Sequence, residues 1–177
     1  MDISGIIEYI RDGYRFIVFI LSALFSLASC HEYTNIYKPL DFSHPENYVC
    51  ASFKVKETEE YLFSIAFDLS DSSKDAEYQK LYGVFTENRS LPGVTLPVEL
   101  YIVKDGEVFF EKKLLTTETN YIVGMPYKGG RLNVTLREIR FVVLPIGSYA
   151  ACLKIDHVAD FDNTKGFFNI NVFNPKI

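Results

Sequence analysis

In the stretch Tyr61 to Leu69, YLFSIAFDL, every second residue is a large aliphatic or aromatic one. The residues on one face of this run are Tyr61, Phe63, Ile65, Phe67 and Leu69. Successive strand residues point to opposite faces, so this period predicts a β-strand with a buried face. Tyr48 to Val55 alternates in the same way, and the polar residues Glu57 to Glu60 separate the two runs. We therefore predict that the two runs form a β-hairpin.

A second hairpin is predicted at Leu96 to Leu115, because Asp105-Gly106 lies between two alternating runs and favours a tight turn. Thr116 to Gly130 is polar and contains several glycines, so we expect a loop there. The remaining strands are expected at Leu132–Leu136, Ile139–Leu144, Tyr149–Ile155 and Phe167–Phe173.

The insertion Ser70 to Ser90 breaks the alternating pattern. Asp71 and the two serines after it are suited to cap a helix, and Gly83 is suited to end one. We predict a short helix over about Lys74 to Tyr82, packed over one end of a sheet. A binding loop is the alternative, because long insertions in β domains often carry function.

This succession of strands predicts an all-β, antiparallel, immunoglobulin-like β-sandwich with one short helix in the insertion. Leu144 to Tyr149, LPIGSY, resembles the strand-turn-strand corner common in immunoglobulin-like and related sandwiches. The longer stretch Leu144 to Ile170, LPIGSYAACLKIDHVADFDNTKGFFNI, resembles a family of uncharacterised small proteobacterial lipoproteins with a single β-sandwich domain. The resemblance implies a fold and an envelope location, and it brings no established catalytic residues.

The apolar run Phe16 to Leu27 is uncharged and shorter than the roughly 20 residues of a membrane-spanning helix. Two arginines precede it, as in the basic start of a secretory signal. Leu27-Ala28-Ser29-Cys30 resembles the bacterial lipoprotein pattern of leucine, two small residues and an acylated cysteine. We therefore expect residues 1–29 to be a lipoprotein signal peptide and Cys30 to carry the lipid. An uncleaved N-terminal anchor helix is the alternative.

Cleavage before Cys30 would leave residues 30–47 as a lipidated tether and residues 48–177 as the β-sandwich domain. The tether contains prolines and has no clean period, although its aromatic residues could instead lie along the domain surface. His31 follows the cysteine, where aspartate would signal inner-membrane retention in enteric bacteria. By resemblance to that sorting rule, we expect the outer membrane, facing the periplasm.

The composition narrows the function classes. The formal net charge is −5, which disfavours nucleic acid and anionic lipid headgroups as partners. The chain has 15 Phe and 12 Tyr but no Trp, and this aromatic load favours strands. No phosphate-binding glycine loop and no nucleophile elbow are present, so we expect neither an enzyme nor a cofactor.

The densest polar cluster is Asp156, His157, Asp160 and Asp162, and it lies on one short connection. Its simplest interpretation is a polar loop, since residues so close in sequence rarely surround a substrate. It does not match a calcium loop, because Lys165 replaces the required glycine, and we expect no metal. The three aspartates instead form a candidate partner contact. The segments expected to make this contact surface are Ser70–Ser90, Thr116–Gly130 and Asp156–Lys165.

Cys50 and Cys152 would be the remaining thiols once Cys30 is acylated, and the expected compartment is oxidising. Both fall on the more polar face of their predicted strands. We predict a disulfide between them; two unpaired buried thiols are the alternative.

These features favour an envelope lipoprotein, held on the membrane through Cys30, whose sandwich binds a protein partner. A specific form is an immunity protein against a periplasm-directed toxin. An envelope structural or assembly lipoprotein is the first alternative, and a carbohydrate-binding module or hydrolase is the second. The tyrosines that could form a sugar-binding row are Tyr48, Tyr101, Tyr121 and Tyr127.

Replacement of Cys30 by serine should abolish lipid attachment, because the acyl chains are expected on its thiol. Radiolabelled palmitate should enter the wild-type protein in growing cells and not Cys30→Ser. Equal labelling of the two proteins would contradict the lipoprotein interpretation.

Overall fold

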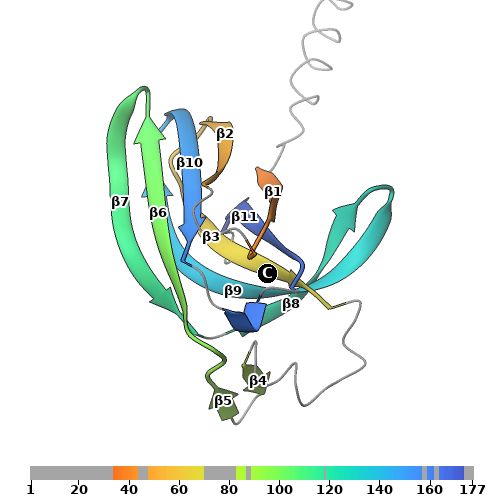
Figure 1. Cartoon of the computed structure of the whole chain (residues 1–177). Coiled ribbons are helices and arrows are strands. Elements are labelled where there is room, and N and C mark those ends of the chain that lie inside the picture. The colour runs from red at the N-terminus through yellow and green to blue at the C-terminus, as the bar shows by residue number, and fades with distance from the viewer. Residues whose placement is uncertain are drawn as a thin grey trace, which may run out of the picture. The chain divides into compact units, whose positions relative to one another are not determined.

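The described chain consists almost wholly of antiparallel strands (Figure 1). The computed structural model describes residues 34–43, 48–69, 83–86, 89–117, 119–156, 159–161 and 164–173. Helical structure in this part is limited to the 3-10 turn η1, Ala159–Phe161. No helix among the described residues is long and apolar enough to cross a membrane. The predicted signal peptide and the predicted helix at Lys74–Tyr82 lie outside the described residues.

Two sheets account for nine of the strands. We call the five-stranded one sheet A; its order is β1 (Asn35–Leu40), β11 (Gly166–Val172), β3 (Glu59–Asp68), β9 (Gly130–Leu144) and β8 (Thr119–Tyr127). Sheet B has the order β2 (Val49–Val55), β10 (Gly147–Ile155), β6 (Leu96–Lys104) and β7 (Glu107–Thr116). The short strands β4 (Val84–Thr86) and β5 (Arg89–Leu91) pair separately. The predicted all-β, antiparallel, sandwich-like architecture is confirmed.

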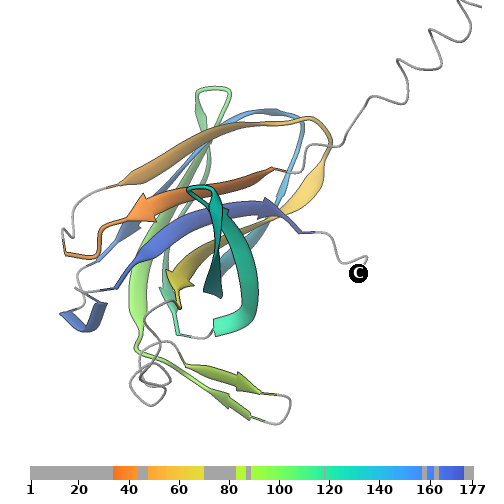
Figure 2. The same ribbon diagram turned by 90° about the vertical axis from the view of Figure 1, so that its right-hand side faces the viewer.

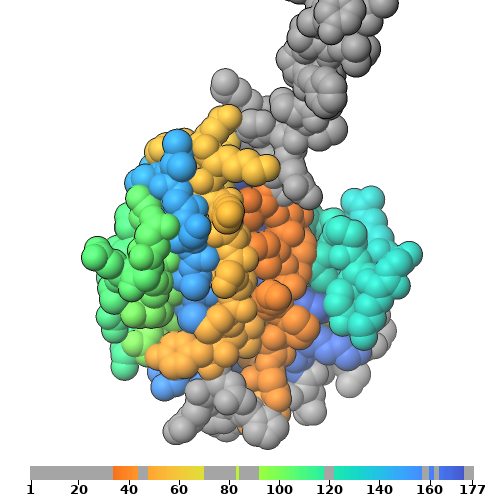
Figure 3. Space-filling view, turned by 90° about the horizontal axis from the view of Figure 1, so that it is seen from above, coloured from red at the N-terminus to blue at the C-terminus, as the bar shows by residue number. Residues whose placement is uncertain are grey.

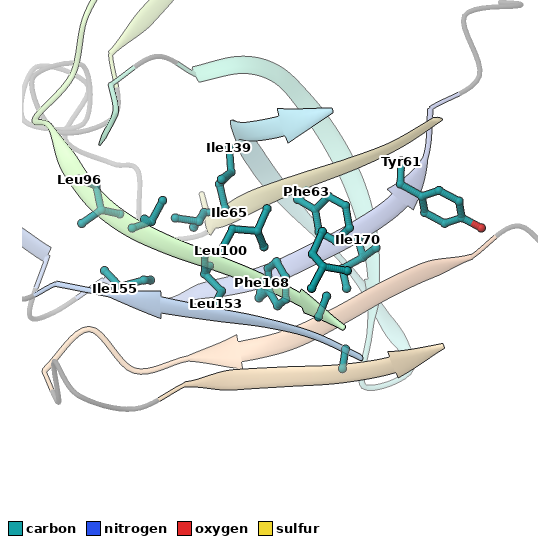
Figure 4. Close-up of a cluster of buried hydrophobic side chains, with 14 of the residues drawn as sticks. Tyr61, Phe63, Ile65, Leu96, Leu100, Ile139, Leu153, Ile155, Phe168 and Ile170 are labelled. Carbon is teal, nitrogen blue, oxygen red and sulfur yellow. The ribbon is translucent and has the colours of Figure 1, made fainter. Parts of the chain in front are cut away.

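The main core lies between the two sheets (Figure 4). Phe63 and Ile65 of β3 are fully buried there, together with Leu100 of β6 and Leu153 of β10. Every residue of β3 from Tyr61 to Phe67 is buried, so both faces of this strand are covered. Burial on both sides explains why the residues on each face of β3 are mainly apolar.

The predicted hairpin at Leu96 to Leu115 is confirmed as β6 and β7. Asp105 and Gly106 both have positive φ values, 50° and 93°, as a two-residue hairpin turn of type I′ requires. Asp105 also binds this turn to the start of β10. Its carboxylate accepts a hydrogen bond of 3.0 Å from the Ser148 amide, and its own amide donates to the Ser148 carbonyl at 2.8 Å.

The predicted hairpin between Tyr48–Val55 and Tyr61–Leu69 is wrong. Both runs are strands, but β2 belongs to sheet B and β3 to sheet A, so the connection passes between the sheets. The partners of β3 are β11 and β9. A strand buried on both faces belongs in the middle of a sheet, and alternation does not identify its neighbours.

The predicted tether, residues 30–47, is wrong over part of its length, because Asn35–Leu40 forms β1 and pairs with β11. The sandwich therefore begins before residue 48, and Thr34–Ile177 forms one compact unit. Pro39 suggested a tether, yet β1 is an edge strand of sheet A. An edge strand tolerates proline, since one side of its backbone needs no ladder partner.

The predicted loop Thr116–Gly130 is also wrong, because most of it is the edge strand β8, paired with β9. Gly124 and Pro126 lie inside this strand. A side chain at position 124 would collide with that of Arg131, since an added Cβ would meet its Nε at 1.8 Å. Glycine there makes room for a neighbouring strand's side chain and does not end the strand.

The two runs expected between Leu132 and Leu144 form one 15-residue strand, β9. Its register against β3 shifts between Phe63 and Ser64, which indicates a bulge near Ile139. A bulge bends a strand and increases its twist. One half of β9 can therefore close the core while the other half extends away with β8 (Figure 2).

Tyr149 provides a test of how the β9–β10 corner is held. Its hydroxyl donates a 2.7 Å hydrogen bond to the Pro145 carbonyl, and burial raises its pKa, with the Asp105 carboxylate adding to the effect. Removing the hydroxyl in Tyr149→Phe should lower the free energy of unfolding by about 0.5–1.5 kcal/mol. Urea denaturation measures this change. Tyr101→Phe, in the same sheet and half-buried, is the control, and an equal loss in both variants would contradict the role of the corner bond.

Candidate functional site

The cysteines predicted to bond, Cys50 and Cys152, lie directly opposite each other in β2 and β10. Their Cα atoms are 4.1 Å apart, and the structure joins them in a disulfide. The bridge lies on the outer face of sheet B, where Cys50 is exposed and Cys152 is half-buried. It crosslinks neighbouring strands and closes a sequence separation of 102 residues.

Charged and aromatic side chains surround this disulfide. Lys154 of β10 is opposite Glu99 of β6, which in turn is opposite Lys113 of β7. Tyr48 extends across this row: its hydroxyl donates to a Glu99 carboxylate oxygen at 3.4 Å, and the Lys154 ammonium lies 5.8 Å from its ring. Opposite charges on neighbouring strands attract, so the row stabilises the pairing of β10, β6 and β7.

The predicted sugar-binding tyrosines are only partly brought together. Tyr48 and Tyr101 share the outer face of sheet B, where Tyr101 lies opposite Cys152. Tyr127 belongs to the other sheet, and the side chain of Tyr121 lies outside the described residues. The described tyrosines therefore do not form one continuous row.

Two of the three aspartates in the predicted contact are exposed. Asp156 follows β10, and its amide donates a 3.0 Å hydrogen bond to the Pro97 carbonyl. It borders a hollow of about 260 Å³ with Glu99 and Lys113. Asp160 is exposed in η1, whereas Asp162 and His157 lie outside the described residues. Among the described residues, no group of three or more histidine, cysteine and acidic side chains could hold a metal ion.

Phe161 and Arg137 fix the base of this acidic connection. The Phe161 ring is fully buried and stacks on Phe42 and Phe67, at centroid distances of 5.7 and 5.6 Å. The buried Arg137 guanidinium lies 5.3 and 5.6 Å from the centres of the Phe67 and Phe161 rings, and it donates to the Val94 carbonyl at 2.8 Å. Sequence reasoning missed Arg137. In the sequence Arg137 alternates with the apolar residues Leu132, Val134 and Leu136, so it falls on the polar side of that run and its burial has no local signal.

The β8–β9 hairpin forms an arm, which we define as residues 122–133, across the outer face of sheet A (Figure 2). Met125 and Val134 on this hairpin are buried against Ala66 and Phe167 in a second, smaller core. Tyr127, near the tip, packs edge-on against Phe167 at a centroid distance of 5.1 Å. This apolar contact holds the arm against the sheet.

The arm ends in a tight turn at Lys128 and Gly129, between the paired residues Tyr127 and Gly130. Both turn residues have positive φ values, 48° and 79°, as in a type I′ turn. Asparagine, aspartate and glycine are the residues favoured in this conformation, so lysine at position 128 carries a conformational cost. The exposed Lys128 ammonium lies 5.2 Å from the centre of the Tyr127 ring.

A groove of about 470 Å³ lies between the arm and the ends of β1 and β11. Figure 3 shows the arm (teal) beside β1 (orange), with part of the blue C-terminal segment between them. Its apolar lining comes from Leu40, Tyr127, Leu132 and Phe167, together with Pro39. Its polar lining consists of Asp68, Lys128, Thr164 and Lys165, and both lysines are exposed.

Buried polar side chains hold the β1 wall of this groove in place. The Ser64 hydroxyl donates to the Asn169 side-chain oxygen at 2.9 Å. The Asn169 amide donates to the Ile36 carbonyl at 3.2 Å and to the Asn35 side-chain oxygen at 3.3 Å. Strands β3, β11 and β1 are thus linked by side chains in addition to their ladders.

The groove joins parts of two predicted contact segments that are far apart in the sequence. Tyr127 and Lys128 come from Thr116–Gly130, while Thr164 and Lys165 come from Asp156–Lys165. Sequence reasoning assigned neither lysine to a shared site. The two lysines line one groove only because the arm folds back onto β11.

The family model described as "Domain of unknown function (DUF5625)" matches residues 37–172. The chain belongs to this family. The match begins within β1 and ends with β11, so it includes the disulfide and the groove. No curated protein matches the chain significantly.

The fold is also similar to the crystal structure of a protein from Sulfurospirillum deleyianum, GEBA250068378. The TM-score is 0.60, the sequence identity is 16%, and the match covers 80% of this chain and 98% of that one. At this identity the likeness concerns the fold alone.

Loss of the disulfide should destabilise the domain, because the bridge restricts the unfolded chain. For a loop of this length the chain-entropy model gives roughly 4.7 kcal/mol, as an upper bound for Cys50→Ser with Cys152→Ser. Urea unfolding with and without reductant measures the loss. The double variant should not respond to reductant, and an unchanged midpoint for the reduced wild-type protein would contradict the stabilising role.

Proposed function

We propose that this protein is a lipid-anchored bacterial envelope protein that binds a protein partner. The observation that carries the proposal is the Cys50–Cys152 disulfide with its exposed cysteine. Disulfides persist in oxidising compartments and are rare in the cytosol. The bridge supports the same location as the lipoprotein pattern at Cys30, with residues 1–29 as a signal peptide. In this proposal the domain lies at the outer membrane and faces the periplasm.

Exposed apolar side chains support a role in binding. Val108 and Ile146 are 58% and 63% exposed, and Phe109 is 39% exposed. These residues lie near one another, because the β6–β7 turn is hydrogen-bonded through Asp105 to Ser148, two residues after Ile146. Neighbouring exposed apolar residues are typical of interaction surfaces. An immunity protein, which would mask a periplasm-directed toxin, is the specific form that we propose.

A carbohydrate-binding module is the second candidate. It is favoured by the exposed Tyr48 and the half-buried Tyr101 on one face of sheet B. Aromatic faces of this kind are suited to stack on sugar rings, and titration with cell-wall oligosaccharides tests this candidate.

We also propose that the domain is immunoglobulin-like at its β9–β10 corner. The Tyr149 hydroxyl donates to the carbonyl four residues upstream, at Pro145. This bond is similar to the tyrosine corner of immunoglobulin-like sandwiches.

The compartment is tested by comparing the full chain with a leaderless chain that starts at residue 30. Thiols are labelled with a maleimide reagent in intact cells, without reductant. The full chain should be found in the membrane fraction, with Cys50 and Cys152 protected. The leaderless chain should remain in the cytoplasm and be labelled at both positions. A soluble full chain with labelled Cys50 and Cys152 would contradict the proposal.

The acidic contact is tested with Asp156→Asn and Asp160→Asn combined, on the partner captured by the wild-type domain from envelope extract. If these carboxylates steer a basic partner, association should slow and become less sensitive to salt. The matched control is Glu59→Gln with Glu60→Gln, beside Leu144 at the other end of the sandwich. Equal effects of the two pairs would contradict a specific acidic contact.

A further inference from the structure

We propose that the groove between the arm and β11 binds a peptide segment in which carboxylates alternate with aliphatic side chains. The inference rests on the proposed protein-binding role, and it specifies the chemical character of the partner's binding segment. The groove includes Thr164 and Lys165 at the end of the acidic connection, but neither Asp156 nor Asp160 lines it, and it lies away from the outer face of sheet B.

The groove has the size and the lining of a ligand site. Its volume of about 470 Å³ lies within the roughly 300–1,000 Å³ range of such sites. Leu40, Leu132 and Phe167 supply apolar surface, while Tyr127 supplies an aromatic wall. Aliphatic side chains would bury apolar area against this lining, which favours binding.

The local charge selects for an anionic partner. Two lysines and one aspartate line the groove, which gives a local charge of +1 on a chain whose net charge is −5. At about 0.1–0.15 M salt, the interaction of a ligand with negative charges more than about 8–10 Å away is largely screened. Direct contacts with the charges that line the groove are screened less. The exposed Lys128 ammonium, on the arm side of the groove, is placed to pair with a carboxylate of an extended segment.

The position of Lys128 is the strongest sign of function. A type I′ turn favours asparagine or glycine, and the β6–β7 turn, also described by the structure, has aspartate at the equivalent place, Asp105. Lysine at position 128 therefore does not serve the turn. It places a cation at the rim of an aromatic groove, 5.2 Å from the Tyr127 ring. Conformational cost of this kind is often retained where it serves binding.

The test uses residues 30–177 with Cys30→Ser, which prevents acylation and keeps the whole compact unit Thr34–Ile177. Fluorescein-labelled peptides LEVEL, LKVKL and LSVSL are titrated and followed by fluorescence anisotropy. LEVEL should bind saturably, several-fold more tightly than the other two, and more weakly as salt is raised. Equal binding of the three peptides, or no saturable binding of LEVEL up to about 1 mM, would overturn the proposal.

Lys128→Asn separates a binding role from a structural one. Asparagine suits the turn, so the variant should melt at the same or a higher temperature while binding LEVEL about two- to fivefold more weakly. Lys112→Gln on β7 is the matched control with no expected effect. A lower melting temperature with unchanged binding in Lys128→Asn would show that the lysine is structural.

Decanoate distinguishes a lipid-like ligand from a peptide. If decanoate binds in the groove and LEVEL does not, the site takes anionic amphiphiles and the peptide proposal is wrong. These measurements use a purified chain and defined probes. The peptide proposal can therefore fail in these measurements while the protein is still found on the membrane and captures a partner. Equally, the peptide can bind even if the protein is not membrane-anchored.

Discussion

Burial of β3 on both faces is the constraint on which the rest of this structure depends. One face of the strand, with Phe63 and Ile65, fills the main core against sheet B. Its other face, with Ala66, contributes to a second core on the outside of sheet A. A strand covered in this way needs hydrogen-bonded neighbours on both edges and packing on both sides. Strands β11 and β9 meet the first need, while the main core and the folded-back arm meet the second.

The second core links the fold to the groove. The bulge near Ile139 divides β9 into a part that closes the main core and a part that extends with β8. The contact of Tyr127 with Phe167 then holds the arm over β11. The groove is the space between the arm and β1. Its walls are strands that pack in the main core and in the second core. Side chains that project from hydrogen-bonded strands have better-defined positions than side chains on long loops.

The two faces of the domain differ in chemistry. The outer face of sheet B carries a disulfide and a row of alternating charges, with Lys154, Glu99 and Lys113 in register across three strands. The outer face of sheet A carries apolar and aromatic residues with lysines at the rim of the groove. The buried Arg137 lies below the acidic connection and stacks against Phe67 and Phe161. Packing of Phe161 in the core therefore anchors the middle of the acidic connection, next to the exposed Asp160.

Local patterns in the sequence determined most of the strands, the Asp105-Gly106 turn and the two-sheet class, because each depends on residues close together in the chain. They also favoured the pairing of Cys50 with Cys152, which the register of β2 against β10 brings about. Only the tertiary structure decided which strands are neighbours, that Asn35–Leu40 joins the sheet, and that Gly124 and Pro126 lie inside a strand. These outcomes depend on edges, bulges and contacts between distant residues. The groove is of the same kind, since Lys128 and Lys165 meet only after β8 and β9 fold back, and no local period in the chain records that contact.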